Sequence, residues 1–201
     1  KLILAMLVEG WAKTEEARET FSSPPNPAEI LAMADRLCEL IDDLIVEDVP
    51  IQNLRTLETE KDLAANWQQS LKFLDIALTA WPQILTARGK AEATSLRNQR
   101  LDRQSEAAPL IYNDRPVIAA GTTGSVPATA RLLQAIARQP RGAVVLPGFD
   151  TTLAPAELEA LLDPKTAAHA HPQYGLTQLV RRLNGFGRVT ELAPKSSLRS
   201  Q

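Results

Sequence analysis

The chain has 201 residues, of which 44% are hydrophobic and 23% charged, and its formal net charge is −2. These proportions are ordinary for a globular protein. The single cysteine, Cys38, excludes an internal disulfide, and no long apolar run or secretory signal is present, so we predict a cytoplasmic protein with no membrane partner.

Charge is spread unevenly along the chain. Residues 1–50 carry 4 basic and 11 acidic side chains, residues 51–115 carry 9 and 8, and residues 116–201 carry 9 and 5. Residues 1–50, the acidic front, and the mildly basic residues 116–201 favour contact between residues 116–201 and a nucleic-acid backbone. Solvated helix faces without a partner are the alternative explanation.

Helical patterns fill the first quarter of the chain. Apolar residues at helical spacing predict a helix over residues 1–19, and a chain that starts inside such a pattern favours a piece of a larger protein. Asn26 is a good N-cap and Pro27 suits the first helical position, so a second helix is expected from there to Ile45. Cys38 falls on its apolar side and is expected in the core.

Two further helices are expected before residue 115. An apolar stripe over residues 63–78 predicts a helix that is capped near Thr59 and turned or kinked at residues 81–82, because a residue before proline avoids the helical region. A more polar helix follows over residues 92–107. It carries Arg97, Arg100 and Arg103 at three-residue steps. This row is the candidate contact for a DNA backbone, and a solvated face is the alternative.

A strand, helix, strand unit is predicted over residues 116–150. Short apolar runs at 117–120 and 143–146 predict strands, and the 22 residues between them, 121–142, are long enough for a crossover. The strands should therefore be parallel neighbours joined by a right-handed crossover. Ligands of open α/β sheets usually bind beyond the carboxyl ends of the strands, at the loops 121–125 and 147–150 here. Later in the chain we expect helices at 155–162 and 176–183 and a strand at 188–192.

The first of these loops is a candidate phosphate-contact site. Ser125 and Pro127 mark the expected N-terminus of the helix that follows this loop. Backbone N–H groups at a helix N-terminus attract anions. No lysine follows as in a phosphate loop of the ATPase type, so a tight strand-to-helix turn is the alternative. The candidate contacts are the following loop residues: Gly121, Thr122, Thr123, Gly124 and Ser125.

The remaining candidates for a metal or hydrolytic site are two histidines and a serine, histidine, aspartate set. His169 and His171 flank one residue in a loop, but few further ligands accompany them, so no metal site is predicted. Ser125, His171 and Asp150 could form a hydrolytic triad, yet no nucleophile-elbow pattern supports one. We therefore expect His171 to hydrogen-bond locally, and we predict no catalytic residue.

Three segments together resemble the AddB subunit of the AddAB double-strand-break repair helicase-nuclease. They are PVIAAGTTGSVPATA at residues 116–130, GAVVLPGFD at 142–150 and HPQYGL at 171–176, and the resemblance extends over residues 32–192 with ANWQQSLKFL and AWPQIL upstream. It implies a superfamily 1 helicase framework whose motor has lost activity, an AddA-type motor subunit as partner, DNA as ligand, and a nuclease domain with an iron–sulfur cluster beyond these residues.

The resemblance also explains what the two loops lack. In an active motor of this framework, the strand matching 117–120 ends in acidic residues that hold Mg²⁺, and the loop after the strand matching 143–146 carries a nucleotide-sensing glutamine. Here residues 121–125 are GTTGS and residues 147–150 are PGFD. Without a carboxylate pair or a phosphate-loop lysine, ATP hydrolysis is not expected, and no cofactor is assigned to this segment.

We therefore predict the α/β class, with a helical lobe packed on a partial parallel sheet that resembles an inactivated superfamily 1 helicase core. The lobe is residues 1–115, the sheet segment 116–192 and a polar tail 193–201. The predicted function is a structural, DNA- and partner-contacting segment of an AddB-type subunit. The alternatives are a small α/β nucleotide- or phosphate-binding protein and a helical protein-interaction module that binds through its acidic front.

Overall fold

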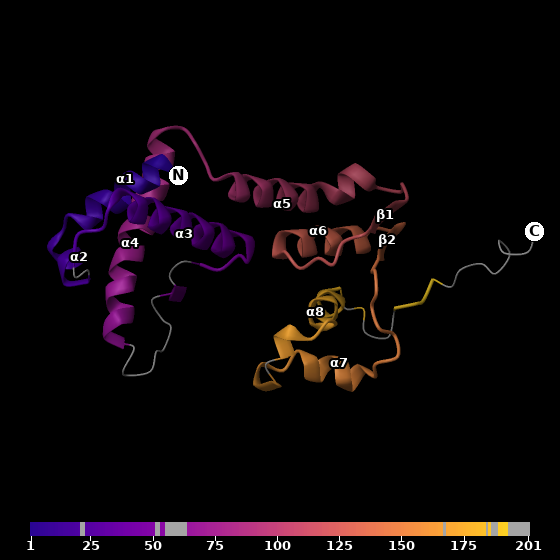
Figure 1. Ribbon diagram of the computed structural model, residues 1–201. Coiled ribbons are helices and arrows are strands. Elements are labelled where there is room, and N and C mark those ends of the chain that lie inside the picture. The colour runs from indigo at the N-terminus through magenta and orange to yellow at the C-terminus, as the bar shows by residue number, and fades with distance from the viewer. Residues whose placement is uncertain are drawn as a thin grey trace, which may run out of the picture. The chain divides into compact units, whose positions relative to one another are not determined.

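The computed structural model describes residues 1–20, 23–50, 53–54, 64–166, 168–183, 185 and 189–192. It is mostly helical with one two-stranded parallel sheet, in agreement with the α/β class (Figure 1). Two compact units, Lys1–Gln99 and Arg100–Gln201, divide the chain inside α5 (Ala93–Tyr112), whereas the sequence placed a lobe boundary at Pro116. No helix in the described ranges is long and apolar enough to cross a membrane.

The first unit begins with two helices where the sequence predicted one. α1 (Leu2–Ala12) ends at Lys13, and α2 (Glu15–Thr20) follows directly. Thr14 separates them, because its Oγ1 accepts a hydrogen bond from the Ala17 N–H at 3.4 Å, in the manner of an N-cap. The prediction of a continuous helix over 1–19 was therefore wrong, since a capping threonine inside the polar stretch starts a new helix.

The start of α3 (Pro27–Val46) confirms the prediction for Asn26. Asn26 Oδ1 accepts hydrogen bonds from the Ala28 and Glu29 N–H groups at 2.9 and 3.1 Å, and Glu29 Oε2 accepts the Asn26 N–H at 2.7 Å. This reciprocal capping box satisfies donors that the first helical turn leaves without partners. Local sequence therefore sets where α3 begins.

The sequence predicted a turn or a kink at residues 81–82, and the turn is not formed, because the long helix α4 (Ala64–Ala87) continues through Pro82. Trp81 accounts for the difference, because its ring is only 8% exposed in the apolar core and its Nε1 donates to Glu92 Oε1. Packing of this ring outweighs the local bias of a residue before proline. The predicted cap at Thr59 and the first residue of the stripe, Leu63, lie outside the described residues.

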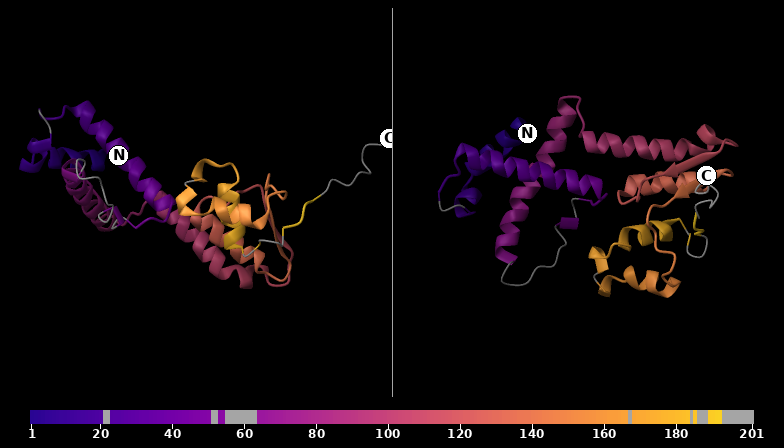
Figure 2. Two further views of the ribbon diagram at one scale, coloured as in Figure 1. Left: turned by 90° about the horizontal axis from the view of Figure 1, so that it is seen from below. Right: turned by 45° about the vertical axis from the view of Figure 1, so that its right-hand side comes forward.

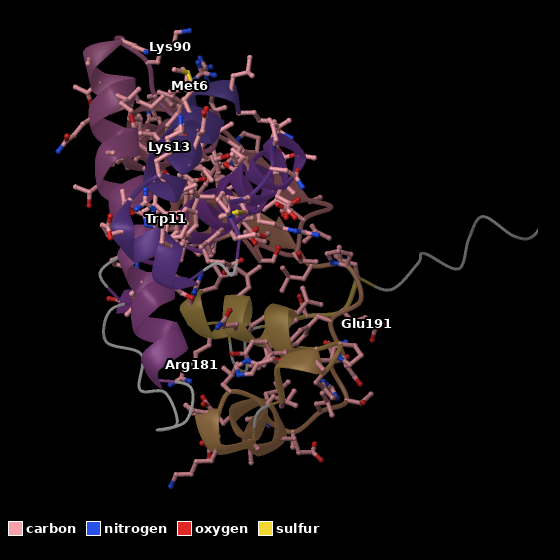
Figure 3. All side chains as sticks on the ribbon, turned by 60° about the vertical axis from the view of Figure 1, so that its left-hand side comes forward. Met6, Trp11, Lys13, Lys90, Arg181 and Glu191 are labelled. Carbon is pink, nitrogen blue, oxygen red and sulfur yellow. The ribbon has the colours of Figure 1, made fainter. Side chains whose placement is uncertain are left out.

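One apolar core joins α1, α3 and α4. Cys38 packs against it and is partly buried, as expected, and burial raises the pKa of its thiol. In the same unit the buried Trp11 ring (Figure 3) packs in a tilted geometry on Phe73, with centroids 4.5 Å apart. The buried core residues are Leu4, Ala5, Val8, Ala34, Leu37, Ile41, Leu78 and Trp81.

The beginning of α5 is tied to the end of α3. Asn98 is 7% exposed and its Nδ2 donates to the Ile45 carbonyl at 2.8 Å, which satisfies an acceptor in the last turn of α3. One turn earlier, Thr94 Oγ1 donates to Asp42 Oδ1 at 2.7 Å. These bonds place residues 93–99 within the first unit.

The second unit contains the predicted parallel pair. β1 (Val117–Ala120) and β2 (Gly142–Val145) pair with Val117 opposite Gly142 and Ala120 opposite Val145, and α6 (Pro127–Ala137) connects them. α6 contacts both strands (Figure 2). The parallel pairing predicted from the length of the connection is confirmed, although β2 begins one residue earlier than expected.

The two faces of this sheet differ. Ala119 and Val144 pack against a cluster formed by Ala130 and Leu133 of α6 with Leu179 of α8 (Tyr174–Arg182). On the other face Ile118 is 67% exposed, and its neighbours Ala120 and Ala143 are exposed as well. One face is therefore covered and the other is apolar and open.

Short helices complete the second unit: α7 (Pro155–Leu161), the 3-10 turns η2 (Pro164–Thr166) and η3 (Ala168–Ala170), and α8. α8 begins two residues before the predicted helix. The strand predicted at 188–192 is not formed by its described part, residues 189–192. Val189 is 37% exposed and Leu192 is 75% exposed. An extended segment that pairs with no strand forms no inter-strand hydrogen bonds and is not stabilised as a strand. Residue 188 and the predicted polar tail, 193–201, lie outside the described residues.

Candidate phosphate loop and nucleic-acid interface

The candidate phosphate loop, residues 121–125, leads from the carboxyl end of β1 into α6. Gly121 and Gly124 adopt positive φ angles of 77° and 60°, which glycine reaches without the steric cost that other residues bear. Thr122 is half-buried, while Thr123 and Ser125 are exposed. The loop therefore lies where the sequence predicted it, at the strand end beside a helix start.

Gly124 is buried, and the core approaches it closely. A Cβ atom at this position would lie 2.8 Å from Leu179 Cδ2 and 2.9 Å from Leu133 Cδ1. Its N–H group donates to Thr122 Oγ1 at 3.2 Å, which closes a turn within the loop. Gly124 thus brings the loop down onto the core, and its N–H is already used.

α6 begins at Pro127, one of the two residues that the sequence marked as its N-terminus, and its first turn has no side-chain cap. The N-cap is Val126, which offers no side-chain acceptor, and Ser125 forms no capping hydrogen bond. The reason is positional, since the helix starts one residue later than a Ser125 cap requires. Pro127 occupies the first turn as predicted and has no N–H, so fewer donors remain there for an anion than in an ordinary first turn.

The arginine of this helix is engaged elsewhere. Arg131 Nε donates to Asp102 Oδ1 at 2.7 Å and Arg131 Nη2 donates to Asp102 Oδ2 at 3.1 Å, a bidentate pair between α6 and α5. Sequence reasoning missed this pair, because nothing local connects residues 29 positions apart. The loop therefore has the dipole of a helix N-terminus but takes no charge from this arginine.

The second loop, residues 147–150, is held by Gln173. Gln173 Oε1 accepts the Asp150 N–H at 3.0 Å, and Gln173 Nε2 donates to the Gly148 carbonyl at 2.9 Å. This side chain spans the loop with two hydrogen bonds, and sequence reasoning did not single it out. The only signal was its place in the HPQYG segment, which says nothing about contact with a loop more than twenty residues away.

Asp150 and His171 form local hydrogen bonds and no triad. Asp150 Oδ1 accepts bonds from the Thr152 Oγ1–H at 2.6 Å and N–H at 2.9 Å, and these bonds lower the pKa of its exposed carboxyl. His171 Nδ1 accepts the Gln173 N–H at 3.2 Å, which confirms its expected local role. Ser125, His171 and Asp150, all described, form no hydrogen bond with one another.

His169 packs against an aromatic ring. Its imidazole meets the Tyr174 ring edge-on, with centroids 4.8 Å apart. Across the ranges that the structure describes, no group of three or more His, Cys, Asp or Glu side chains is arranged to hold a metal ion. The two neighbouring histidines are thus occupied by contacts within their own segment.

The candidate DNA-contact row lies on α5. Arg97, Arg100 and Arg103 are all exposed, and none of them forms an ion pair with a carboxylate in the described part of the chain. Three-residue steps rotate successive side chains by about 60° around a helix axis, so the row occupies one broad side of α5. Arg97 belongs to the first unit, and Arg100 and Arg103 belong to the second.

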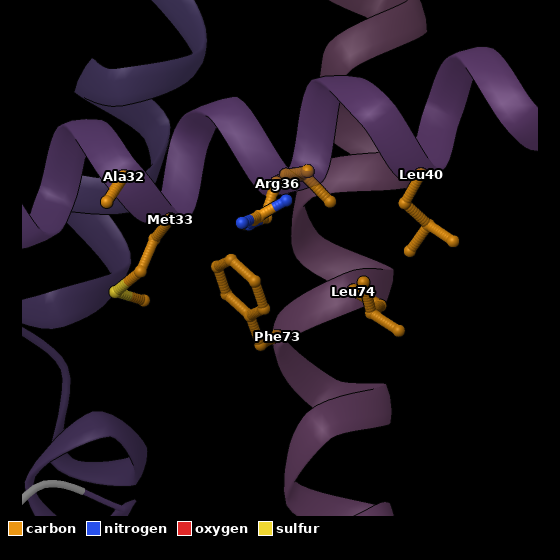
Figure 4. A pocket seen from close by; sticks show the side chains of 7 residues that line it. Ala32, Met33, Arg36, Leu40, Phe73 and Leu74 are labelled. Carbon is orange, nitrogen blue, oxygen red and sulfur yellow. The ribbon is translucent and has the colours of Figure 1, made fainter.

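An apolar groove of about 320 Å³ lies between α3 and α4 in the first unit (Figure 4). Phe73 of α4 points towards Met33 and Arg36 of α3. The Arg36 guanidinium is paired with Glu39 at 2.8 Å, so the groove has an apolar floor and a charged rim. The lining residues are Ala32, Met33, Arg36, Leu37, Leu40, Phe73 and Leu74.

Comparisons of the chain with protein-family models, with curated proteins and with solved structures gave no match. A functional assignment therefore depends on the residues and their geometry. The geometry provides two strand-end loops closed by internal hydrogen bonds and a set of exposed arginines.

Proposed function

We propose that this chain is a non-catalytic segment of an AddB-type subunit that contacts DNA and an AddA-type motor subunit in a helicase-nuclease that processes double-strand breaks. Residues 116–150, which contain two of the three segments of the resemblance, form a parallel strand, helix, strand unit, and this supports the proposal because ligands of open α/β sheets bind beyond the carboxyl ends of the strands. One observation carries the non-catalytic part of the proposal. Polar groups at both strand ends are already engaged, because the Gly124 N–H bonds to Thr122 within the first loop and Gln173 bonds to the Asp150 N–H and the Gly148 carbonyl of the second.

The residue types at this edge do not suit ATP hydrolysis. Phosphoryl transfer needs a cation clamp on the phosphates and carboxylate ligands for Mg²⁺. Asp150 is the one carboxylate in the two loops, and its Oδ1 is taken by Thr152. Arg131, the arginine of the helix that follows the first loop, is paired with Asp102. This edge of the sheet therefore has a structural role and no catalytic function.

Contact with a partner is supported by the open face of the sheet. Parallel sheets are normally covered on both faces, and their strands are apolar on both sides for that reason. Ile118, Ala120 and Ala143 are apolar and exposed on one face. This favours a packed position within a larger assembly, in which the AddA-type motor subunit is the proposed partner.

Two measurements test this proposal. The purified chain, assayed with ATP, Mg²⁺ and linear duplex DNA, is expected to hydrolyse no ATP and to cut no DNA. Metal-dependent activity that is lost in Asp150→Asn or His171→Ala would overturn it. Co-expression with an AddA-type motor subunit is expected to give co-purification that Ile118→Glu weakens and Leu2→Glu, at a 77% exposed position of the first unit, leaves unchanged.

The groove between α3 and α4 supports a second candidate, a helical protein-interaction module. Its apolar floor, with Met33 and Phe73, suits the apolar side of an amphipathic helix. α3 carries five acidic residues and one basic residue, so a partner helix with basic flanks would complement it. Binding of a basic amphipathic peptide that Phe73→Ala abolishes and Leu31→Ala preserves would favour this candidate.

A small nucleotide-binding protein is the remaining alternative. Titration of the chain with ATP tests it, and saturable binding would favour it. Gly124→Val is unsuitable as a test variant, because a side chain at this position collides with Leu133 and Leu179 whether or not a ligand binds. Ser125→Glu is the better choice, since Ser125 is exposed and the substitution places a repelling charge where a phosphate would lie.

A further inference from the structure

A second group of arginines lies at the edge of the sheet opposite the candidate phosphate loop. We name Arg115, Arg138 and Arg141 the amino-edge arginines. Arg115 precedes β1 by two residues, Arg141 directly precedes β2, and Arg138 is the C-cap residue of α6. In parallel strands joined by a helix, these three positions come to the same edge of the sheet. All three side chains are exposed.

Backbone hydrogen bonds bring Arg115 and Arg141 close together. The Val117 N–H donates to the Arg141 carbonyl at 3.0 Å, and Arg141 Nη1 donates to the Asp114 carbonyl at 3.4 Å. The Arg115 N–H donates to the Tyr112 carbonyl at 2.7 Å, which closes the turn after α5. The two arginines are thus held by the first rung of the sheet.

Arg138 is fixed by the turn that joins α6 to β2. The Gln139 N–H donates to the Ile136 carbonyl and the Gly142 N–H to the Gln139 carbonyl, each at 3.0 Å. Gly142 lets the chain pass close to α6, because a Cβ atom there would lie 1.9 Å from the Ile136 carbonyl oxygen. This hydrogen-bonded turn therefore carries both Arg138 and Arg141.

Among the described residues, no carboxylate neutralises the charges of the amino-edge arginines. None of the three forms an ion pair within the described part of the chain, whereas Arg131 pairs with Asp102 and Arg181 (Figure 3) reaches Glu159 at 3.8 Å. Asp114 lies in the same turn, and Arg141 contacts its main-chain carbonyl, not its carboxylate. The edge thus keeps unpaired positive charge.

We infer that the amino-edge arginines bind the phosphate backbone of duplex DNA. Arginine presents a planar fork of donors that matches phosphate oxygens, and three exposed forks along one sheet edge suit an extended polyanion. The inference rests on the proposed function, from which it takes DNA as the ligand, and it adds a contact site separate from the row on α5. It assigns no sequence preference, because phosphate contacts carry no sequence information.

Salt-dependent binding of the whole chain to a labelled 20-base-pair duplex, measured by fluorescence anisotropy, tests the inference. The variant R115Q/R138Q/R141Q is expected to bind more weakly at low salt, and the slope of log K against log salt should fall by about 1 for each phosphate that is no longer bound. The variant R115K/R138K/R141K should keep most of the slope, because lysine preserves the charge. Thermal melts establish that each variant is folded, and R115Q alone replaces the triple variant if the latter does not fold.

The matched control is R97Q/R100Q/R103Q, which removes the same charge from the row on α5. If R115Q/R138Q/R141Q binds with the wild-type affinity and slope while the control loses affinity, the inference is overturned and the DNA contact of the proposed function stands. If the wild-type chain binds no duplex at low salt, both fail, and an acidic protein surface becomes the ligand to test. A loss of duplex affinity in R115Q/R138Q/R141Q that R115K/R138K/R141K does not show supports the inference.

Discussion

The two units of this protein are stabilised in different ways. Among the residues that the structure describes, the first unit has a cluster of eight buried residues spread over α1, α3 and α4, whereas the cluster on one face of the two-stranded sheet in the second unit has three, Ala130, Leu133 and Leu179. In the first unit, stability is distributed along helical stripes. In the second, the chain comes close to its core at Gly124 and Gly142, where an added side chain would meet other atoms. Substitutions should therefore act through lost burial in one unit and through steric collision in the other.

The largest expected effect is at Gly142 in the second unit. In Gly142→Val, the new Cβ atom would lie 1.9 Å from the main-chain oxygen of Ile136, and a backbone atom in a helix cannot move aside as a side chain can. We expect a loss of more than about 4 kcal/mol in the free energy of unfolding of this unit. Hydrogen exchange of β1 and β2 amides measures it.

The control for Gly142 lies in the same unit. Gly175 sits in α8, where an added Cβ atom would have nothing within 4 Å and the φ angle is not positive, so Gly175→Ala should be neutral or stabilise by about 0.5–1 kcal/mol. If Gly142→Val protected the strand amides as well as Gly175→Ala does, the steric explanation for the second unit would be wrong.

In the first unit, Leu37→Ala should cost about 2–5 kcal/mol, because Leu37 is 2% exposed at the centre of the three-helix core. Leu31→Ala is the matched control on the same helix, since Leu31 is 50% exposed and should change stability little. Chemical denaturation followed by the tryptophan signal measures both, since all three tryptophans of the chain, Trp11, Trp67 and Trp81, lie in this unit. Equal effects of the two variants would contradict the distributed core.

Gly124→Ala should have a smaller effect than Gly142→Val, although both add a side chain to a crowded position. The atoms that a Cβ would meet at Gly124 are the ends of Leu133 and Leu179, which can shift, so we expect about 1–3 kcal/mol from collision and the positive φ. Gly121→Ala separates the two contributions. It has a similar φ of 77° and nothing within 4 Å, so it should show the backbone cost alone, about 1–2 kcal/mol. Thermal melts of the two variants compare them.

The smallest expected effect concerns the pH dependence of Asp150. Bonds from the Thr152 hydroxyl and N–H lower the pKa of its carboxyl, so Thr152→Val should raise that pKa towards the usual value of about 3.9. A lowered folded-state pKa contributes stability above the unfolded-state pKa and loses it as pH falls through the folded-state value. NMR titration of the Asp150 carboxyl checks the direction, and an unchanged pKa in Thr152→Val would contradict it.

Several elements could be predicted because their signals are local. Asn26 and Pro27 start α3 through a capping box that closes within four residues. The parallel pairing of β1 and β2 follows from two short apolar runs and a connection long enough for a helix. The positions of the two strand-end loops follow from the same pattern.

Other features could not be predicted because they depend on contacts between distant residues. The helical path through Pro82 depends on the burial of Trp81 in the core of the first unit. At the candidate site, Gln173 bonds to a loop more than twenty residues earlier, and Arg131 pairs with Asp102 across two helices. The spacing of residues along the sequence does not predict such pairs.

The sequence by itself determined the α/β class, the strand order and the absence of a phosphate-loop lysine at residues 121–125, because periodicity, connection length and residue type are local properties. Only the tertiary structure decided which polar groups at the strand ends are used internally and which arginines keep their charge unpaired. The physical reason is that hydrogen bonds and ion pairs depend on distances that the folded backbone sets, as at Gly142, where an added carbon atom would lie 1.9 Å from the Ile136 carbonyl oxygen.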